Sequence, residues 1–334
     1  MSIKVIQQLT GFSYSTISRV LNGKAKEFRI SEETCKIILE AAKKVNYRPN
    51  ILARGLRLQK TMSIGLIVSD IENPFFGALS SKIETCLREH GYSTILCNTS
   101  EVPENEEFYL QVLMDRRVDG IIIAPIHTEE WQYLEEVRKE TSVVLIDRII
   151  EGSDLPWVTS GNSQAAETLT SRLIDLNYRN IAYLGGTPDT YINKVRFEGF
   201  RNAFKACSLE VCEDLVSFQG YSSEAGAKMM EKLLSDFPDV EAVVCVNNLV
   251  FFGAMKVVQE YETKGGKPFM MAAFDIGHYC SMFKRPLICA NQDLGALAET
   301  GVSLLLDQIE NRPMKNHHLM IPSEVCSFRI NKTG

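Results

Sequence analysis

Strand-sized apolar runs alternate with amphipathic helical runs over most of this 334-residue chain. The runs that we expect to form strands are 64–68, 94–97, 120–124, 143–146, 181–184, 214–218, 242–246, 270–274 and 287–290. Continuous apolar strands separated by helices predict parallel sheets with helices on both faces. Because these strands are too many for one comfortable sheet, and because the composition changes near Gly161, we expect an α/β body of two doubly wound lobes.

Charge is distributed unevenly between the start of the chain and this body. Residues 1–60 carry 12 Lys and Arg against 4 Asp and Glu, a net charge of +8, whereas the remainder carries −14. A small basic segment on an acidic body indicates an electrostatic footprint for a polyanion such as DNA. The alternative is a basic tail that has no partner.

The basic segment begins with the pattern of two short helices. Ile3, Ile6 and Leu9 share one helix face, Gly11 breaks the pattern, and Ser13 is suited to cap a second helix. In that helix the residues expected to face inward are Ile17, Val20 and Leu21, and those expected to face outward are Tyr14, Ser15, Ser18 and Arg19. Two helices joined by a Gly-containing turn are typical of a helix-turn-helix, whose second helix lies in the DNA major groove.

A third helix and a short fourth segment follow. Ser31 caps the third helix, whose expected buried face is Cys35, Ile38, Leu39, Ala42 and Val45. Pro49 ends this run and starts a basic segment that contains Gly55. Because so short a helix is marginal in water, we expect it to form only with DNA or a partner chain.

These runs are similar to motifs of the LacI/GalR family of bacterial transcription regulators. Residues 11–23 (GFSYSTISRVLNG) resemble that family's helix-turn-helix, and residues 47–56 (YRPNILARGL) resemble its hinge helix; Ile64-Gly65-Leu66 and the run 70–76 extend the match. The resemblance implies a helix-turn-helix head, a hinge helix and two lobes like those of periplasmic binding proteins. The implied bounds are 1–46 for the head, 47–60 for the hinge helix and linker, 61–160 plus 291–318 for the first lobe, and 161–290 plus 319–334 for the second.

The resemblance also implies which residues contact DNA. Tyr14, Ser15 and Arg19 would read the major groove, and Leu56 from each of two chains would wedge into the minor groove. The full candidate set is Ser13, Tyr14, Ser15, Thr16, Ser18, Arg19, Asn22, Lys24, Lys26, Arg29, Tyr47, Asn50, Ala53, Arg54 and Leu56. A core position is the alternative for Leu56.

The head departs from the family pattern at two places. Val5 and Gln7 stand where the family usually has Asp and Ala in the first helix. The loop 23–29 is longer than most of the family carries and resembles the branch of fructose regulators (catabolite repressor/activator) and sucrose regulators. The two lysines and one arginine of this loop suit contacts to DNA phosphates, with a solvated loop as the alternative.

Polar side chains follow several of the predicted strands, at the edge where ligands of such sheets bind. They are Asp70, Asn73, Asp147, Asn247, Asp275 and Gln292. Carboxylates and amides suit sugar hydroxyls, Phe75 or Phe76 would stack on a sugar face, and Arg196 would bind an anomeric oxygen or a phosphate. In the family, residues matching Phe75, Asp147, Arg196, Asn247, Asp275 and Gln292 surround a small effector. The alternatives are strand-end caps and, for Asp147, an ion pair with Arg148.

Signatures of catalysis, metal binding and membrane insertion are missing from the sequence. It has no phosphate-binding loop, dinucleotide fingerprint or nucleophile elbow, and the adjacent His317 and His318 cannot both face one metal from a regular element. We therefore expect no enzyme, cofactor or metal. No apolar run is long enough to span a membrane, and the nine scattered cysteines, with no Cys-x-x-Cys pair, suit the reducing cytoplasm.

Together these features predict a cytoplasmic, sequence-specific DNA-binding transcription regulator of carbohydrate metabolism, most simply a repressor. We expect a homodimer on a near-palindromic double-stranded operator, controlled by a sugar or sugar phosphate between the two lobes. Because no leucine-heptad tail follows the body, we expect a dimer rather than a tetramer. The alternatives are a sugar-binding protein and a sugar-phosphate enzyme, each without operator-specific DNA binding.

Overall fold

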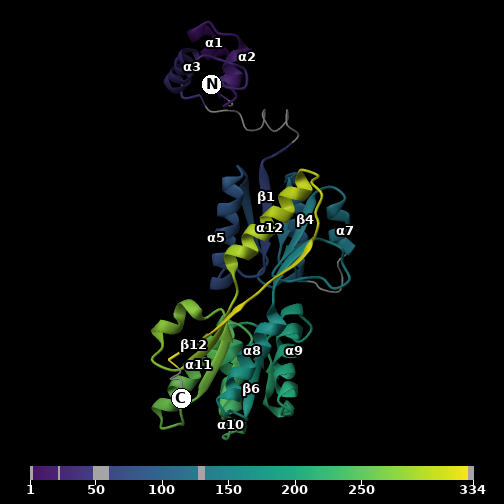
Figure 1. Ribbon diagram of the computed structural model, residues 1–334, viewed down its shortest axis with the longest axis vertical. Helices are drawn as coiled ribbons and strands as arrows, with labels where there is room; N and C mark the ends of the chain where they lie inside the picture. Colours follow the sequence, from purple (N-terminus) through teal and green to yellow (C-terminus); the bar gives the residue numbers. More distant parts are fainter. Residues whose placement is uncertain (1–2, 22, 48–59, 127–131, 330–334) are drawn as a thin grey trace. The chain divides into compact units, whose positions relative to one another are not determined.

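The computed structural model of the protein describes residues 3–21, 23–47, 60–126 and 132–329. The chain divides into two compact units, Met1–Thr61 and Met62–Gly334, which we call the head and the body (Figure 1). Within the described residues, no helix is long and apolar enough to cross a membrane.

In its described part, the head has three helices around a small core. Its helices are α1 (Ile3–Thr10), α2 (Tyr14–Leu21) and α3 (Glu32–Lys44). One fully buried isoleucine from each helix, Ile6, Ile17 and Ile38, forms the centre of the core. Leu39 was expected in this core, but it is 52% exposed. The helical step of about 100° per residue carries it away from the face of Ile38, and Ala41, which was not predicted, is buried beside the predicted Ala42.

The first lobe of the body is a parallel sheet with helices on both faces. Its strand order is β11-β5-β4-β3-β1-β2. The strands are β1 (Ser63–Val68), β2 (Ser93–Asn98), β3 (Gly120–Ile123), β4 (Ser142–Ile146), β5 (Trp157–Ser160) and β11 (His318–Ile321). Helices α5 (Pro74–Glu89) and α12 (Leu294–Ile309) pack on one face, and α6 (Pro103–Asp115) and α7 (Gln132–Arg138) on the other (Figure 1).

The second lobe repeats this plan. Its strand order is β12-β10-β9-β8-β6-β7, with β12 antiparallel to β10 and the other pairs parallel. The strands are β6 (Ile181–Gly185), β7 (Val216–Phe218), β8 (Ala242–Cys245), β9 (Met270–Phe274), β10 (Leu287–Asn291) and β12 (Glu324–Phe328). Helices α8 (Asn162–Asp175) and α9 (Tyr191–Ala206) pack together on one face, and α10 (Ser223–Asp236) and α11 (Asn248–Thr263) on the other.

Three details differ from the sequence prediction. Strand β5 was not predicted, because it is four residues long and carries two polar residues after Val158. The run 214–218 forms a 3-10 turn over Glu213–Leu215 before β7 begins. The chain was expected to enter the second lobe at residue 319, but β11 pairs with β5 through Ile321, so the crossing falls between β11 and β12. The two-lobed α/β fold itself is confirmed.

Candidate functional site

Helix α2 presents polar residues at its N-terminal end, as the sequence predicts. The Ser13 Oγ accepts a hydrogen bond from the Thr16 amide at 3.2 Å and thereby caps the helix. Tyr14 is 57% exposed, and Ser15 and Arg19 are also exposed, whereas Ile17 and Val20 are buried. Because the apolar face holds α2 against the other two helices, its polar face is free to meet a DNA groove.

Arg19 has a partner that sequence analysis did not find. Its guanidinium carbon lies 3.9 Å from the centre of the Phe28 ring, which comes from the loop between α2 and α3. Phe28 is 41% exposed, so the contact forms at the surface. A stacked guanidinium has less rotational freedom, so Phe28 restricts the orientation of Arg19.

Removal of the Phe28 ring is expected to weaken DNA binding moderately. A cation–π contact at an exposed site contributes about 0.5–1 kcal/mol, which corresponds to about a two- to fivefold loss of affinity for Phe28→Ala. Phe28→Tyr keeps the ring and is expected to bind as the wild type does. Gel shifts of the full-length protein on one selected duplex measure both, and an alanine variant with unchanged affinity contradicts the positioning role.

The other predicted DNA contacts lie on α2 (the half-buried Ser18), on the loop after it, just after α3 and outside the described residues. Lys24, Lys26 and Arg29 are all exposed on the loop, and Lys24 forms a surface ion pair with Glu27 at 3.6 Å. Tyr47 is half-buried, and its pKa is raised by burial and by the nearby Tyr14. The remaining candidates lie outside the described residues; they are Asn22, Asn50, Ala53, Arg54 and Leu56.

A cavity of about 560 Å³ lies between the two lobes of the body. All nine predicted effector residues line it; they are Asp70, Asn73, Phe75, Phe76, Asp147, Arg196, Asn247, Asp275 and Gln292. They meet because the carboxyl ends of the parallel strands in each sheet face the gap between the lobes. The structure therefore brings the whole predicted set together at one place.

Two carboxylates enter the cavity from left-handed backbone positions. Asp147 has φ of 65° after β4, and Asp275 has φ of 58° after β9. Asp147 is 4% exposed, and burial raises its pKa to about 6. Burial also raises the pKa of Asp275, whose carboxylate accepts bonds from the Gln292 side-chain amide at 2.8 Å and from its backbone amide at 3.2 Å. Desolvated carboxylates are strong acceptors for ligand hydroxyl groups.

Arg196 is held from several directions at the base of the cavity. Its Nε donates to Asn162 Oδ1 at 2.8 Å, and its Nη1 donates to the Val246 carbonyl at 2.6 Å. The guanidinium carbon lies 3.7 Å from the centre of the Phe274 ring. Because these contacts fix its plane, Arg196 presents its remaining donors in a single orientation.

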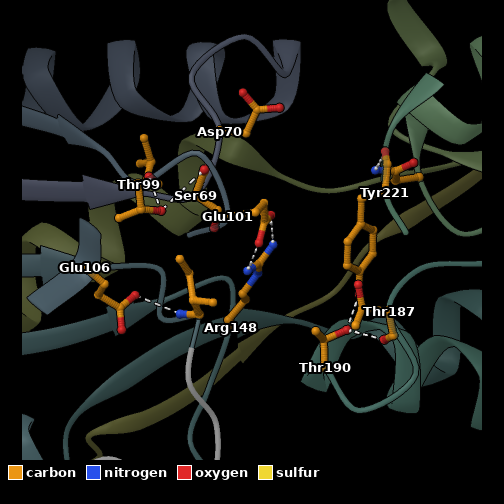
Figure 2. A network of polar contacts seen from close by, with 12 residues as sticks. Ser69, Asp70, Thr99, Glu101, Glu106, Arg148, Thr187, Thr190 and Tyr221 are labelled. Carbon is orange, nitrogen blue, oxygen red and sulfur yellow. Dashed lines mark hydrogen bonds and ion pairs between the residues drawn. The ribbon is translucent and has the colours of Figure 1, made fainter. Parts of the chain in front are cut away.

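Arg148 pairs with a residue that sequence analysis overlooked. Its partner is the Glu101 carboxylate rather than the adjacent Asp147, with one of two hydrogen bonds at 2.9 Å (Figure 2). The guanidinium carbon lies 5.9 Å from the Phe76 ring centre and 5.8 Å from that of Tyr221. Phe76 belongs to the first lobe and Tyr221 to the second, so Arg148 bridges aromatic rings of both lobes.

Hydrogen bonds also link the lobes and close helix ends at the cavity. The Asn248 side-chain amide donates to Asn73 Oδ1 at 3.0 Å, which joins the start of α11 to the start of α5. Asn73, Ser222 and Asn247 cap the helices that follow them with their own side chains. The strand-end cap interpretation therefore holds for Asn73 and Asn247, which line the cavity as well.

Several cavity residues come from loops and were not predicted. Tyr221 lies on the segment before α10, and its hydroxyl bonds to Thr190 Oγ1, as Figure 2 shows. Thr187, Thr190 and Ser100 also line the cavity. Only the run of small and hydroxyl residues at 185–190 could have indicated this wall, because Tyr221 follows no strand end in the pattern. Among the described residues, no group of three His, Cys, Asp or Glu is placed to hold a metal ion.

A helix-turn-helix head on a body with a polar, aromatic-lined cavity between two lobes defines a DNA-binding regulator that responds to a small molecule. The family model described as "Periplasmic binding proteins and sugar binding domain of LacI family" matches residues 61–267, and that described as "Bacterial regulatory proteins, lacI family" matches residues 2–50. The chain belongs to the LacI family. It is a DNA-binding transcription regulator with a sugar or sugar-phosphate effector, and it is not an enzyme.

Relatives and solved structures agree with this assignment. The ribose operon repressor of Halalkalibacterium halodurans is 30% identical over 333 residues, which cover 100% of this chain and 98% of the relative. The catabolite repressor/activator of Escherichia coli is 28% identical over 311 residues, covering 93% and 92%. The Lac repressor dimer bound to operator has a TM-score of 0.82 at 19% identity, covers 97% of each chain, and shows the shared fold.

Proposed function

We propose that the protein is a homodimeric repressor that binds a near-palindromic operator in the bacterial cytoplasm and responds to a carbohydrate in the cavity between its lobes. The observation that carries the proposal is the convergence of all nine predicted effector residues on one cavity in a chain that also bears a helix-turn-helix. The effector contacts are proposed to be the nine residues, with Asp147 and Asp275 as hydroxyl acceptors and Arg196 as donor.

Large exposed apolar side chains on the first lobe support the dimer. Leu96 on β2, Val102 before α6 and Phe108 on α6 are all large apolar side chains, and Phe108 is 60% exposed. A second copy of the chain would bury exposed apolar side chains of this kind in a symmetric interface.

The head and the segment 47–60 are proposed to bind DNA together. Tyr14, Ser15 and Arg19 reach base edges, while Lys24, Lys26 and Arg29 contact phosphates. Leu56 from each chain enters the minor groove, and the short hinge segment forms a helix only when paired on the operator. An effector that changes the lobe arrangement thereby shifts operator affinity by about 5- to 150-fold, the usual range of such coupling.

The long loop 23–29 also supports a placement near the fructose regulators. The E. coli relative described above is named a catabolite repressor/activator, and its similarity covers most of the chain. A similar level of identity to a ribose operon repressor gives equal support to a pentose. The proposal therefore extends to a monosaccharide regulator and leaves the sugar to experiment.

Selection of operators from a random duplex library tests the proposal directly. The full-length protein is expected to enrich a near-palindromic sequence, and a cognate sugar is expected to change affinity for it. Arg19→Ala is expected to relax the preference at one base position of each half-site, at a cost of about 1–3 kcal/mol, because a bidentate arginine contact is lost.

The contradicting outcomes are equally clear. If the wild type enriches no sequence from the library, operator recognition is contradicted. An unchanged base preference in Arg19→Ala contradicts the assignment of Arg19 alone. Lys232→Ala, an exposed change on α10 of the body, serves as the matched control and should select the same operator as the wild type.

A further inference from the structure

The cavity between the lobes carries an excess of negative charge. Among the described residues, its charged lining consists of four carboxylates and two guanidinium groups: Asp70, Glu101, Asp147 and Asp275, with Arg148 and Arg196. With every group ionised, the lining has a formal charge of −2. An anionic ligand would therefore enter a region that already repels it, whereas an uncharged ligand would not.

Both guanidinium groups already donate hydrogen bonds to protein acceptors, although the buried Arg148 Nε has no acceptor among the described residues. Arg148 donates two hydrogen bonds to Glu101 and is 5% exposed on its side chain. Arg196 donates to Asn162 and to the Val246 carbonyl. A phosphate that reached Arg148 would have to displace Glu101 and leave that carboxylate beside a second anion.

The helix N-termini at the cavity, which could attract an anion, are already capped by protein side chains. Side-chain oxygens of Asn73, Ser222 and Asn247 already accept from the amides of Phe75, Ala225 and Val250. Asp70 and Asp147 add negative charge to the same lining, which opposes the attraction of helix N-termini for an anion. The positive ends of these helices, which would attract a phosphate, are thus largely compensated by side chains of the protein itself.

The remaining groups suit hydroxyls and an apolar sugar face. Asp147 and Asp275 are acceptors, and the Gln292 Oε1 is buried with no hydrogen-bond donor among the described residues. Phe75, Phe76 and Tyr221 supply aromatic surface. Unfilled acceptors match the hydroxyl donors of a sugar, while a fully ionised phosphate provides only acceptors.

We propose that the effector is an uncharged sugar and that the cavity discriminates against the phosphate ester of that sugar. The proposal rests on the carbohydrate-controlled function proposed above and narrows its ligand class. Glu101 is the discriminating residue, because it neutralises the one buried guanidinium that faces both lobes.

Matched ligand pairs test the proposal on the full-length protein. Titration calorimetry at neutral pH compares ribose, fructose, glucose and cellobiose, each beside its phosphate ester, and fluorescence anisotropy follows the selected operator. A sugar that binds and changes operator affinity, with an ester about tenfold or more weaker, is the expected result. An ester that binds more tightly than its parent sugar overturns the proposal and leaves the regulator intact. If no sugar or ester binds to a protein that still selects one operator, both the carbohydrate effector and this proposal are overturned.

A charge-removing variant tests the residue. Glu101→Gln keeps the side-chain size and removes the charge that neutralises Arg148, so the ester-to-sugar affinity ratio is expected to rise about tenfold. Glu104→Gln makes the same charge change at an exposed position of α6 outside the cavity lining, and its ratio should match the wild type. An unchanged ratio in Glu101→Gln, or an equal shift in both variants, overturns the role of Glu101; a thermal unfolding scan confirms that each variant is folded.

Discussion

Replacement of Asp147 by asparagine is expected to stabilise the protein while impairing its response to the effector. Burial raises the pKa of this carboxyl from 3.8 to about 6. At about 1.4 kcal/mol for each pKa unit, this difference corresponds to a free-energy penalty of about 3 kcal/mol on the charged form. An uncharged amide of the same shape avoids that penalty, so the free energy of unfolding should rise by about 1–3 kcal/mol at neutral pH. Loss of a charge-assisted acceptor should weaken sugar binding by about 10- to 100-fold.

The pH dependence of the wild type provides an independent check. Because the folded-state pKa lies above the unfolded value, the folded protein binds more protons between about pH 4 and 6. The stabilising contribution of Asp147 is therefore fully present below pH 4 and is lost as the pH rises through about 6. Arg148 and Arg196 oppose this shift, while Asp275 and Glu101 add to it. Sugar binding needs the ionised form and should weaken as the pH falls below 6.

Chemical denaturation and calorimetry at several pH values measure both effects. In Asp147→Asn the part of the pH dependence that belongs to this group should disappear. Asp239→Asn, a change at an exposed loop position, should alter neither stability nor sugar affinity. An Asp147→Asn protein that is less stable than the wild type at neutral pH, or that binds the sugar as well, contradicts the assignment.

Introduction of a methyl group at Gly253 is expected to destabilise the second lobe strongly. Gly253 lies in α11, where an added Cβ would come within 1.8 Å of the Ser223 carbonyl oxygen of α10. Backbone cannot move aside as a flexible side chain does, so the two helices must separate. The expected cost of Gly253→Ala is about 3 kcal/mol, or roughly a hundredfold in the unfolding equilibrium, despite the better helix propensity of alanine.

A second glycine supplies the matched control. Gly77 lies in α5, where an added Cβ would meet only the Ile71 carbonyl oxygen at 3.6 Å. Gly77→Ala should leave stability unchanged or raise it by up to about 1 kcal/mol. Urea denaturation measures the free energy of unfolding of both variants. Equal values would show that α10 and α11 tolerate separation. The helix-turn-helix head should bind DNA normally in both proteins below their unfolding transitions.

Local pattern was sufficient for much of the architecture. Continuous apolar runs such as Ile121-Ile122-Ile123 become fully buried strands, because only a strand covered on both faces can bury every residue. The cap at Ser13 and the turn at Gly11 likewise depend on neighbouring residues alone, and α2 follows from them. Polar residues at strand ends pointed to the cavity because parallel strands end at a common edge.

Contacts between distant segments were beyond this kind of prediction. Arg19 with Phe28, and Arg148 with Glu101, join residues that no periodicity relates. Tyr221 reaches the cavity from a loop, and β11 pairs with β5 across 157 residues of intervening chain, from Ser160 to His318. Leu39 shows the same limit, because packing of three helices selects which of two neighbouring apolar residues is buried.

The amino-acid pattern alone thus established the classes of element, the basic head, the two-lobed body and nine of the residues that line the cavity. Which acceptors occupy the two arginines, which carboxylate becomes desolvated and which glycines two helices require became visible only in the folded chain. The physical reason is that hydrophobic periodicity and helix capping depend on interactions between residues that are neighbours along the chain. Burial and ion pairing depend instead on which distant segments the fold brings within a few ångströms.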